Sequence, residues 1–478
     1  MTGTESSRGR IQLIAGLLLA GLLVVVPACS DTNDPVDVTD TGDTSDDTAD
    51  TTPAAPELTS LSPERVIVGD VLTISGVNLG DGDGSAVTVG GVSAEVISWS
   101  ATVIEIEVPD VLPGEQPVVV TLGDDATDGL TVAVLLPRRA YVALGTLDES
   151  VSDGIAILEV GADGALTELD SSPFSVGVPT GWYFGGAPGN LAIDEARRRL
   201  FFSGTNGIAI MAIDPRDGTL AHVPGSPFVF TGVGDMYGLA VAPGGQDLYV
   251  NRSADGELVH YPVAADGSIS TEAAVAYAVT SWADAVHVTP DGQFVYTTSG
   301  TRLHGFLRTA ATGALTEIDG SPWDIEETYG CSLNPSGSRL YCGAYDNDEV
   351  FALDVHPTSG ALTETAGSPW SVDGSGPINV AFHPDGSRLW VSMWYSDEVT
   401  SFNVAGDGSL SASQTLAIVV QPAPSAVSRD GAVLVVLGQN GESVASFAIS
   451  GSGFASAGDD VVLPEGSYPS AVQLAGFR

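Results

Sequence analysis

The sequence predicts an all-β protein in which a small β-sandwich precedes a seven-bladed β-propeller. Its 478 residues include 58 Gly and 28 Pro but only 16% charged and 7% aromatic residues, a turn-rich composition typical of short strands. Five strand-like runs fill residues 57–134, separated by Gly, Pro and Asp. A repeat of about 45 residues then recurs seven times within residues 138–478, and this is the period of propeller blades.

The amino terminus predicts a secretory signal over residues 1–28. Two arginines precede the apolar run of residues 11–26, whose 16 residues are short for a membrane-spanning helix. The sequence V-P-A-C ending at Cys29 resembles the lipobox of bacterial lipoproteins, which implies that Cys29 is diacylated and becomes the mature N-terminus. By the same resemblance, Ser30 favours the outer membrane. An ordinary cleaved signal and an uncleaved anchor are the alternatives.

Residues 29–56 predict a disordered acidic tether. The segment holds eight Asp, no basic residue and almost nothing apolar, so it cannot bury enough surface to offset its chain entropy. A calcium site is the alternative, but these aspartates lack the D-x-D-x-D-G spacing of calcium-binding loops.

Residues 57–134 predict a separate sandwich of short strands, VLTISG, AVTVGGV, AEVISWS, VIEIEVP and PVVVTL. The segments LTSLSPERVIVGDVLTISGVNLG and VTVGGVSAEVISWSATVIEIEVP resemble the IPT/TIG family, which implies an immunoglobulin-like fold that serves as a spacer or adhesive module without catalytic residues. Asp81, Asp83 and Ser85 are either cation ligands or, as their Asp/Gly context favours, an ordinary turn.

Two markers define the propeller repeat. The first is a hairpin of the type VAFHPDGSRLWV (residues 380–391), in which proline presets φ for the first turn position and glycine accepts a positive φ. Its turns follow one another at intervals of 47, 45, 49 and 45 residues, at Pro243, Pro290, Pro335, Pro384 and Arg429. The second marker, of the type DGALTEL, runs in phase and begins seven times, at Asp163, Asp217, Asp266, Thr312, Ser359, Asp407 and Ser452. Stacked blades bury the faces that one hairpin cannot.

The two ends of the repeat region predict how the ring closes. The first marker is preceded only by the strand AYVALG, which starts at Ala140, so the first blade lacks its inner strand. The segment that begins at Pro469 repeats the one that begins at Pro424, at an offset of 45 residues. We therefore expect the C-terminal strand to pair beside AYVALG, which removes the open sheet edges.

The markers, over all seven units, resemble the lactonase-type propellers, which include 6-phosphogluconolactonase and muconate cyclase, and more loosely the YVTN-repeat surface propellers. The resemblance implies the fold but gives poor support for the activity. Family enzymes place a histidine five residues before a hairpin proline, and here those positions hold Gly238, Ala285, Gly330 and Asn379. The family's Glu after Tyr-Val-x-Asn is replaced by Arg252, which has the opposite charge.

Four residues are candidates for lactone chemistry, which needs a polar group at the ester and cations to hold carboxylate or phosphate. His287 lies on an inner strand and either faces the channel or packs between blades. Arg252 and Arg302 begin loops, where a solvated arginine is the alternative. Glu349 recurs as Glu398 in the next unit, which favours a turn preference over a site.

Cys331 and Cys342 face each other across the predicted hairpin of the fifth blade. With the turn at residues 335–338, they occupy directly opposed strand positions. An exported protein meets oxidising conditions, so we expect a disulfide here, with two buried free thiols as the alternative.

The charge pattern excludes several classes of function. The net charge is −45, and all 16 basic residues are Arg, so the chain lacks the lysine of a Walker A loop, a kinase or a Schiff-base enzyme. The acidic surface argues against nucleic acid and against direct membrane binding other than through the lipid anchor. The sequence has no HExxH, no G-x-S-x-G and no cluster of His and Cys, so we expect no metal site and no cofactor.

The leading functional hypothesis is a lipid-anchored, monomeric binding protein outside the cytoplasm, on the outer membrane, the cell surface or the periplasmic face. Its propeller would bind an unidentified small molecule, glycan or protein at one rim. The first alternative is a lactonase-like hydrolase outside the cytoplasm, since a working signal excludes a cytoplasmic 6-phosphogluconolactonase. The second alternative is a structural adhesin that works through the immunoglobulin-like domain.

Overall fold

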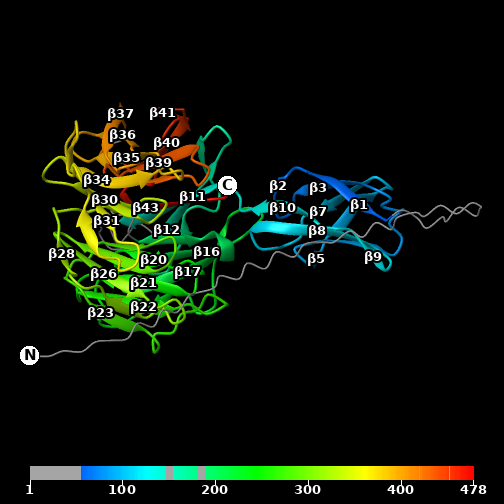
Figure 1. The fold of residues 1–478 in the computed structure, drawn as a ribbon, viewed down its shortest axis with the longest axis horizontal. Helices are drawn as coiled ribbons and strands as arrows, with labels where there is room; N and C mark the ends of the chain where they lie inside the picture. The colour runs from blue at the N-terminus through cyan, green and yellow to red at the C-terminus, as the bar shows by residue number, and fades with distance from the viewer. Residues whose placement is uncertain (1–54, 147–153, 180–189, 419, 452, 478) are drawn as a thin grey trace, which may run out of the picture. The chain divides into compact units, whose positions relative to one another are not determined.

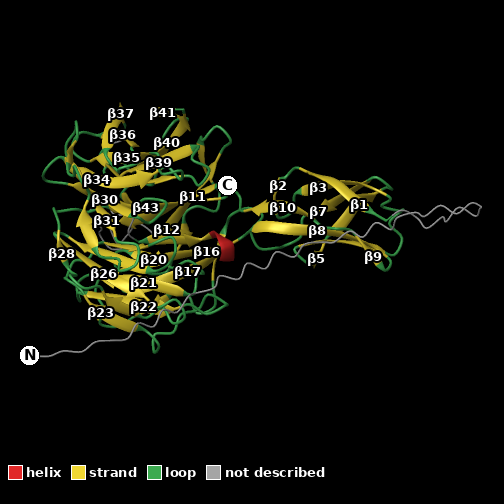
Figure 2. Ribbon diagram, viewed as in Figure 1, coloured by secondary structure: helices red, strands yellow, loops and turns green. Residues whose placement is uncertain are grey.

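The computed structural model describes residues 55–146, 154–179, 190–418, 420–451 and 453–477. The predicted signal, Cys29 and nearly all of the tether lie outside these residues. The described chain is built from strands, with one short 3-10 turn at Glu195–Arg197 (Figure 2). A search of the described residues for a helix that is long and apolar enough to span a membrane finds none.

The predicted sandwich is confirmed, and two sheets form it. The first sheet has the order β1 (Glu57–Ser62), β3 (Val71–Val77), β7 (Val103–Glu107) and β6 (Glu95–Trp99). The second has the order β2 (Arg65–Ile67), β10 (Leu130–Leu135), β8 (Gly114–Leu122), β4 (Ser85–Val89) and β5 (Val92–Ser93), with β9 (Asp125–Ala126) beside β8. Alternate residues such as Leu72, Ile104 and Val120 are fully buried between the sheets, as the period of a strand requires.

The predicted seven-bladed propeller is also confirmed, because the described residues beyond the sandwich form seven four- or five-stranded antiparallel sheets (Figure 1). Blade 1 holds β43 (Ser467–Ala475), β11 (Arg139–Thr146), β12 (Gly154–Val160), β13 (Leu166–Glu168) and β14 (Phe174–Ser175). Blade 2 holds β15 (Leu191–Asp194), β16 (Arg199–Gly204), β17 (Gly207–Ile213), β18 (Leu220–His222) and β19 (Phe228–Val229). Blade 3 holds β20 (Leu239–Val241), β21 (Asp247–Arg252), β22 (Glu257–Pro262) and β23 (Val275–Ala278).

The remaining four blades continue the same pattern. Blade 4 holds β24 (Ala285–Val288), β25 (Phe294–Ser299), β26 (Arg302–Arg308), β27 (Leu315–Glu317) and β28 (Trp323–Asp324). Blade 5 holds β29 (Cys331–Leu333), β30 (Arg339–Ala344), β31 (Glu349–Val355), β32 (Leu362–Glu364) and β33 (Trp370–Ser371). Blade 6 holds β34 (Pro377–Phe382), β35 (Arg388–Met393), β36 (Glu398–Val404) and β37 (Leu410–Ala417). Blade 7 holds β38 (Pro422–Val427), β39 (Val433–Gly438), β40 (Ser443–Ser450), β41 (Gly453–Ser456) and β42 (Val461–Val462).

The C-terminal strand closes the ring, as the repeat predicts. Strand β43 pairs antiparallel with β11 from Arg139 opposite Ala475 to Thr146 opposite Ser467, and the two strands lie together in Figure 1. The inner strands contact one another in the cyclic order β43, β15, β20, β24, β29, β34, β38 and back to β43. Blade 1 is therefore assembled from both ends of the repeat region.

A buried hydrogen bond joins neighbouring blades at four of the junctions. A tyrosine at the third position of the second strand donates its hydroxyl to the carbonyl of the marker glycine in the next blade. The pairs are Tyr141 to Gly218 (2.8 Å), Tyr249 to Gly313 (2.6 Å), Tyr296 to Gly360 (2.7 Å) and Tyr341 to Gly408 (2.9 Å). This bond explains why tyrosine recurs at this position of the hairpin.

The geometry at Gly360 shows why the marker needs glycine. Its φ is +69°, and a Cβ there would lie 2.5 Å from Cδ1 of Phe294. The same strand position in blades 2, 6 and 7 holds Phe201, Trp390 and Val435, all fully buried. Trp390 meets Phe454 of blade 7 edge-on, with ring centroids 6.1 Å apart, so apolar packing replaces the hydrogen bond there.

Cys331 and Cys342 are joined by a disulfide. They are opposed residues of β29 and β30, with their Cα atoms 4.1 Å apart, and Leu333 faces Leu340 in the same ladder. The bond ties the inner strand of blade 5 to its neighbour.

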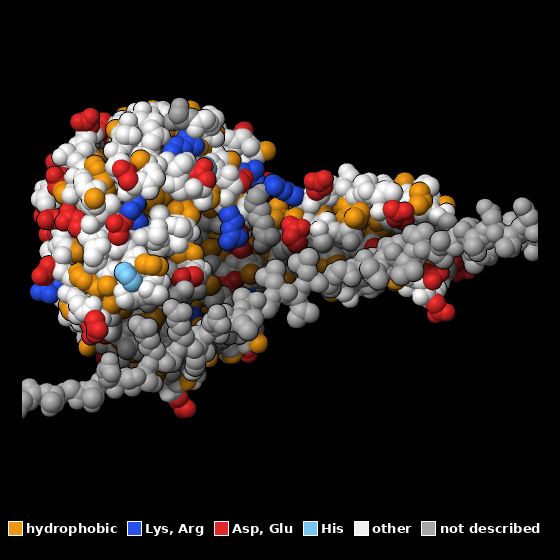
Figure 3. All heavy atoms as spheres, in the orientation of Figure 1, with side chains coloured by type: hydrophobic (Ala, Val, Ile, Leu, Met, Phe, Trp, Pro, Cys, Tyr) orange, Lys and Arg blue, Asp and Glu red, His pale blue; other side chains and the backbone are white. Residues whose placement is uncertain are grey.

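Charged side chains are scattered among uncharged groups on the face of the propeller drawn in Figure 3, without a large basic patch. Acidic groups are scattered over this face, and most of the blue arginine side chains lie apart from one another. This distribution accords with the excess of 61 acidic over 16 basic residues.

The blade-to-blade bond predicts a loss of stability on Tyr296→Phe. The change leaves the ring in place but removes the hydroxyl that donates to the buried carbonyl of Gly360. Because that carbonyl has then lost its donor, the free energy of unfolding should fall by about 1–3 kcal/mol. Denaturant unfolding measures the loss, and Ser93→Ala, which removes an exposed hydroxyl, is the control. Equal stability of Tyr296→Phe and the control would contradict a structural role for the bond.

Candidate functional site

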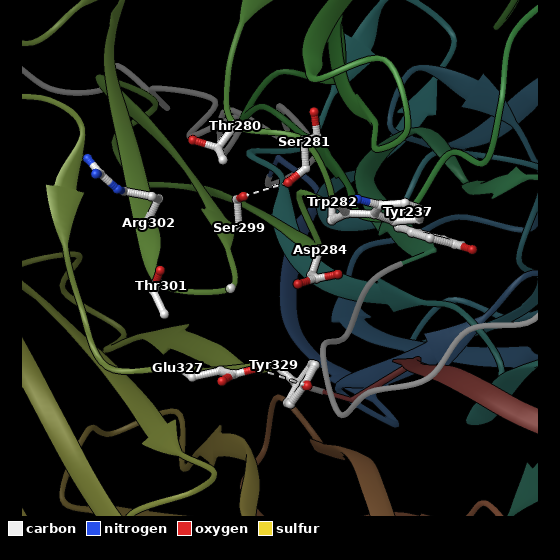
Figure 4. Close-up of a pocket in the computed structure, with 11 residues that line it drawn as sticks. Tyr237, Thr280, Ser281, Trp282, Asp284, Ser299, Thr301, Arg302, Glu327 and Tyr329 are labelled. Carbon is white, nitrogen blue, oxygen red and sulfur yellow. Dashed lines mark hydrogen bonds between the residues drawn. The ribbon is translucent and has the colours of Figure 1, made fainter.

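The candidate site is a cavity of about 550 Å³ in the propeller, formed by blades 3, 4 and 5 (Figure 4). Its walls are the segments that enter the inner strands β20, β24 and β29, together with the loop between β25 and β26. The aromatic and ionisable residues of the lining are Tyr237, Trp282, Asp284, Arg302, Glu327 and Tyr329. These segments lie outside the hairpin and marker motifs of the repeat.

Three of these side chains come from one repeated position. Tyr237, Asp284 and Tyr329 each stand six residues before the hairpin proline of their own blade. Because the blades are arranged in a ring, this position recurs side by side around the channel. Asp284 of blade 4 is therefore flanked by a tyrosine from each neighbouring blade.

Asp284 is unusual for an acidic side chain. Burial raises the pKa of its carboxyl to about 7, and a hydrogen bond from the backbone N–H of Gly300 opposes this only in part. Near neutral pH the carboxyl therefore exists in both protonation states. It can accept a hydrogen bond in one state and donate one in the other.

The two tyrosines donate to other carboxylates. Tyr237 donates its hydroxyl to Asp235 at 2.9 Å, and Tyr329 donates to Glu327 at 3.2 Å, as the dashed line in Figure 4 marks. Burial and the neighbouring carboxylate raise the pKa of both phenols, that of Tyr329 to about 12. Both rings consequently stay neutral and fixed in the wall.

Arg302 does not supply a free positive charge to the cavity. Its Nε lies 3.0 Å from the carboxylate of Asp324, and in Figure 4 the guanidinium extends away from Asp284. It is the one basic side chain among the described residues that line the cavity. The lining is therefore acidic and aromatic, with hydroxyl groups from Thr280, Ser281 and Ser299.

Trp282 is the most strained residue of the wall. Its φ is +65°, a conformation that large side chains rarely adopt, and its side chain is 63% exposed. The backbone N–H of Trp282 donates to the carbonyl of Ser253 at 2.7 Å, which holds this conformation in place. Strain of this kind is stored at functional sites more often than elsewhere.

The buried side chain of His304 supports the loop that carries Trp282. The backbone N–H of Thr280 lies 3.0 Å from Nε2 of His304, and the hydroxyl of Thr280 lies 2.9 Å from the same atom. Burial lowers the pKa of His304, so its ring is neutral and accepts both bonds at neutral pH. Ser299 adds a third anchor by donating its hydroxyl to the carbonyl of Ser281 at 2.9 Å.

The structure places the four predicted candidates apart from one another, and only Arg302 lines the cavity. His287 follows Asp284 by three residues on β24; burial lowers its pKa to about 4, and its Nε2 has no hydrogen-bond partner among the described residues. Arg252 donates to the hydroxyl of Tyr261 at 2.9 Å and pairs with Glu257. Glu349 begins β31, where Ser371 is its hydrogen-bond partner at 3.4 Å.

The other blades show how unusual His287 is at its position. In the other blades the residues that pair with the third position of the second strand are Gln473, Ala192, Ala240, Ser332, Ala381 and Ala426, so all but Gln473 are small. The sequence could also have indicated Asp284 as a site residue, because it occupies the same position of the repeat as Tyr237 and Tyr329, six residues before the hairpin proline. Trp282 carried no such signal, since its importance depends on a backbone angle that composition and spacing do not reveal.

A second cavity, of about 600 Å³, lies where the hairpin turns gather at the inner strands. Pro243, Pro290 and Pro384 line it, together with Phe382 and the ion pair between Arg429 and Glu195. Its walls are the repeated turns themselves. This cavity is thus a product of the scaffold.

Comparisons with known proteins agree with the fold. Residues 56–134 match the IPT/TIG domain, and residues 271–373 match the family described as lactonase, 7-bladed β-propeller. The chain therefore carries an IPT/TIG domain and a lactonase-type propeller region. A search of curated proteins finds no match to the sequence.

Two solved structures illustrate the likeness of the propeller. One is a "putative 6-phosphogluconolactonase" from Bacteroides uniformis, with 16% identity and a TM-score of 0.59 over 71% of this chain and 99% of that one. The other is the periplasmic gluconolactonase PpgL from Pseudomonas aeruginosa, with 18% identity and a TM-score of 0.57 over 71% of this chain and 99% of that one. At such identities the likeness shows the fold alone.

The raised pKa of the half-buried Asp284 predicts a specific pH dependence of stability. The unfolded chain releases this proton near the ordinary pKa of 3.8, whereas the folded protein keeps it until about pH 7. Between these two pH values the carboxyl is ionised only in the unfolded chain, and this ionisation lowers the free energy of the unfolded state relative to the folded one. The wild type should therefore lose stability relative to Asp284→Asn as the pH rises from about 4 to about 7. Above pH 7 the difference should stay constant.

Denaturant unfolding of both proteins at a series of pH values measures this difference. Asp255→Asn, at an exposed position in the loop between β21 and β22, corrects for the loss of one charge. A difference between wild type and Asp284→Asn that does not vary between pH 4 and pH 7 would show that the carboxyl is not perturbed.

Proposed function

We propose that the propeller binds an uncharged, hydroxyl-rich ligand of about the size of one sugar ring in the cavity of Trp282 and Asp284. The observation that carries the proposal is Trp282, a large aromatic side chain held in a strained conformation and exposed beside a cavity. An aromatic ring offers a flat apolar face on which the C–H face of a sugar can stack. The surrounding carboxyl and hydroxyl groups suit the ligand's hydroxyls.

The charge of the cavity supports an uncharged ligand over a phosphorylated or carboxylated one. Recognition of phosphate or carboxylate relies on arginine guanidinium or lysine ammonium groups, and the one arginine in the described lining is already paired with Asp324. Asp284, Glu327 and the adjacent Asp235 would repel an anion. A neutral sugar avoids this cost.

We place this binding function outside the cytoplasm. The support comes from the sequence alone: a signal over residues 1–28, a lipobox-like cysteine at position 29, and an acidic tether that follows it. In this arrangement the protein is a monomer held to the membrane by its acyl anchor, and the IPT/TIG domain is a spacer.

Removal of the tryptophan ring tests the binding function. Trp282→Ala should weaken binding of neutral monosaccharides by at least tenfold, since a tenfold change in affinity corresponds to about 1.4 kcal/mol of lost contact. Titration calorimetry with a panel of neutral hexoses and pentoses measures the affinity. Trp282→Phe, which keeps an aromatic face, should retain most of it. The proposal fails if no sugar of the panel binds, or if Trp282→Ala binds as the wild type does.

A second candidate function, lactone hydrolysis, is favoured by the Asp284 carboxyl. A pKa of about 7 suits a general base at neutral pH. In such a reaction the carboxylate takes a proton from water, the water oxygen bonds to the lactone carbonyl carbon, the ring C–O bond breaks, and the ring oxygen takes the proton. Of the similar propellers, one is described as a putative 6-phosphogluconolactonase and one as a periplasmic gluconolactonase. The histidine and glutamate that the resemblance to lactonase-type propellers implies are replaced here.

Hydrolysis of glucono-δ-lactone distinguishes the two functions. The hydrolase predicts a rate above that of buffer that rises as the pH passes through about 7, because the ionised Asp284 is the active form, and a loss of at least about 100-fold in Asp284→Asn. A 6-phosphorylated lactone should react more slowly because of the acidic lining. Pure binding predicts the buffer rate in both proteins, measured by acid release at constant pH.

A further inference from the structure

A second exposed aromatic ring lies on blade 6. Tyr395 stands in the loop between β35 and β36, and its side chain is 63% exposed. Most large hydrophobic side chains of the propeller are buried in the contacts between blades. An aromatic ring of this size left in solvent needs an explanation in terms of what covers it.

The loop that carries Tyr395 is firmly held. The backbone N–H of Tyr395 donates to the carbonyl of Ser375 at 3.0 Å, and that of Trp394 donates to the carbonyl of Gly376 at 2.8 Å. The N–H of Ser375 in turn donates to the hydroxyl of Ser396 at 2.7 Å. The exposure of Tyr395 is therefore not the result of a loosely attached loop.

The ring of Tyr395 packs on one side against the backbone of Gly376. A Cβ at this glycine, whose φ is +71°, would lie 2.8 Å from Cδ2 and 3.4 Å from Cε2 of Tyr395. Any larger residue at position 376 would displace the ring. With one side supported in this way, the exposed area belongs to the rest of the ring, which forms a fixed platform.

A line of tyrosines connects this platform with the cavity. Tyr329 lines the cavity and meets Tyr345 edge-on, with centroids 5.1 Å apart, and Tyr345 meets Tyr395 at 5.3 Å. Tyr345 is only 6% exposed, so it supports its two neighbours from below. The platform thus lies two ring contacts away from the cavity wall.

Polar groups border this line on blade 5. Asn347 donates its side-chain amide to Glu326 at 2.7 Å, and both side chains are exposed. Asp348 accepts a hydrogen bond from the N–H of Gly376 at 2.9 Å. These amide and carboxylate groups can exchange hydrogen bonds with hydroxyls, and none of them carries a positive charge that would select an acidic polymer.

We infer that the site takes a neutral glycan of several sugar units, with one unit in the cavity at Trp282 and a later unit stacked on Tyr395. The inference rests on the proposed function, because it assumes that the cavity binds a sugar. Two separate rings set among polar groups suit a chain of sugar units. A protein partner would instead require a continuous apolar patch at the centre of its interface.

Titration calorimetry with neutral homo-oligosaccharides of one to six units tests the inference. Series built from glucose, galactose, mannose and xylose serve as probes for the full-length protein. For at least one series, affinity should rise at least tenfold with length and then level off. Tyr395→Ala should remove this gain, so that longer members bind no better than short ones, whereas Tyr395→Phe should keep it.

The outcomes separate this inference from the proposed function. If monosaccharides bind through Trp282 but affinity does not rise with length, or rises equally in Tyr395→Ala, the glycan inference is wrong and the proposed function stands. If no sugar of any length binds, both are wrong. Because Tyr395 is largely exposed, its replacement leaves the core intact, and an unchanged melting temperature confirms this for each variant.

Discussion

The hydrogen bond from a buried tyrosine hydroxyl to a glycine carbonyl of the next blade sets how the blades of this propeller meet. It recurs at four junctions with lengths of 2.6–2.9 Å, and buried polar groups of this kind are costly unless they are paired. Each bond links a hairpin of one blade to the marker turn of its neighbour. The ring therefore brings equivalent positions of successive blades side by side, and the candidate site depends on that arrangement.

Within this scaffold, variation at a single repeated position generates much of the site's chemistry. The position six residues before the hairpin proline holds Tyr237, Asp284 and Tyr329 in blades 3, 4 and 5, but Ile378 in blade 6. Burial at this position raises the pKa of the Asp284 carboxyl. A regular fold can thus acquire a local function without any change in its hairpins, since the hairpin turns lie at the opposite ends of the inner strands.

The fold was predictable because its determinants repeat. Seven in-phase markers indicated seven blades, the repeat at Pro424 and Pro469 indicated the closure, and the register of the hairpin placed Cys331 opposite Cys342. The site was less predictable because it lies in segments that do not repeat. His287 attracted attention through its chemistry, whereas the left-handed backbone of Trp282 and the burial of Asp284 arise only when loops from three blades meet.

The pairing of β43 with β11 also has a consequence for biosynthesis. Strand β11 begins at Arg139, but its partner ends at Ala475, so more than 300 residues must be made before the first blade is complete. Until then the growing chain presents an unpaired strand edge that other chains can join. A premature stop codon shortly before residue 467 would leave that edge permanently open, so the truncated product should be recognised as misfolded although most of its blades are intact.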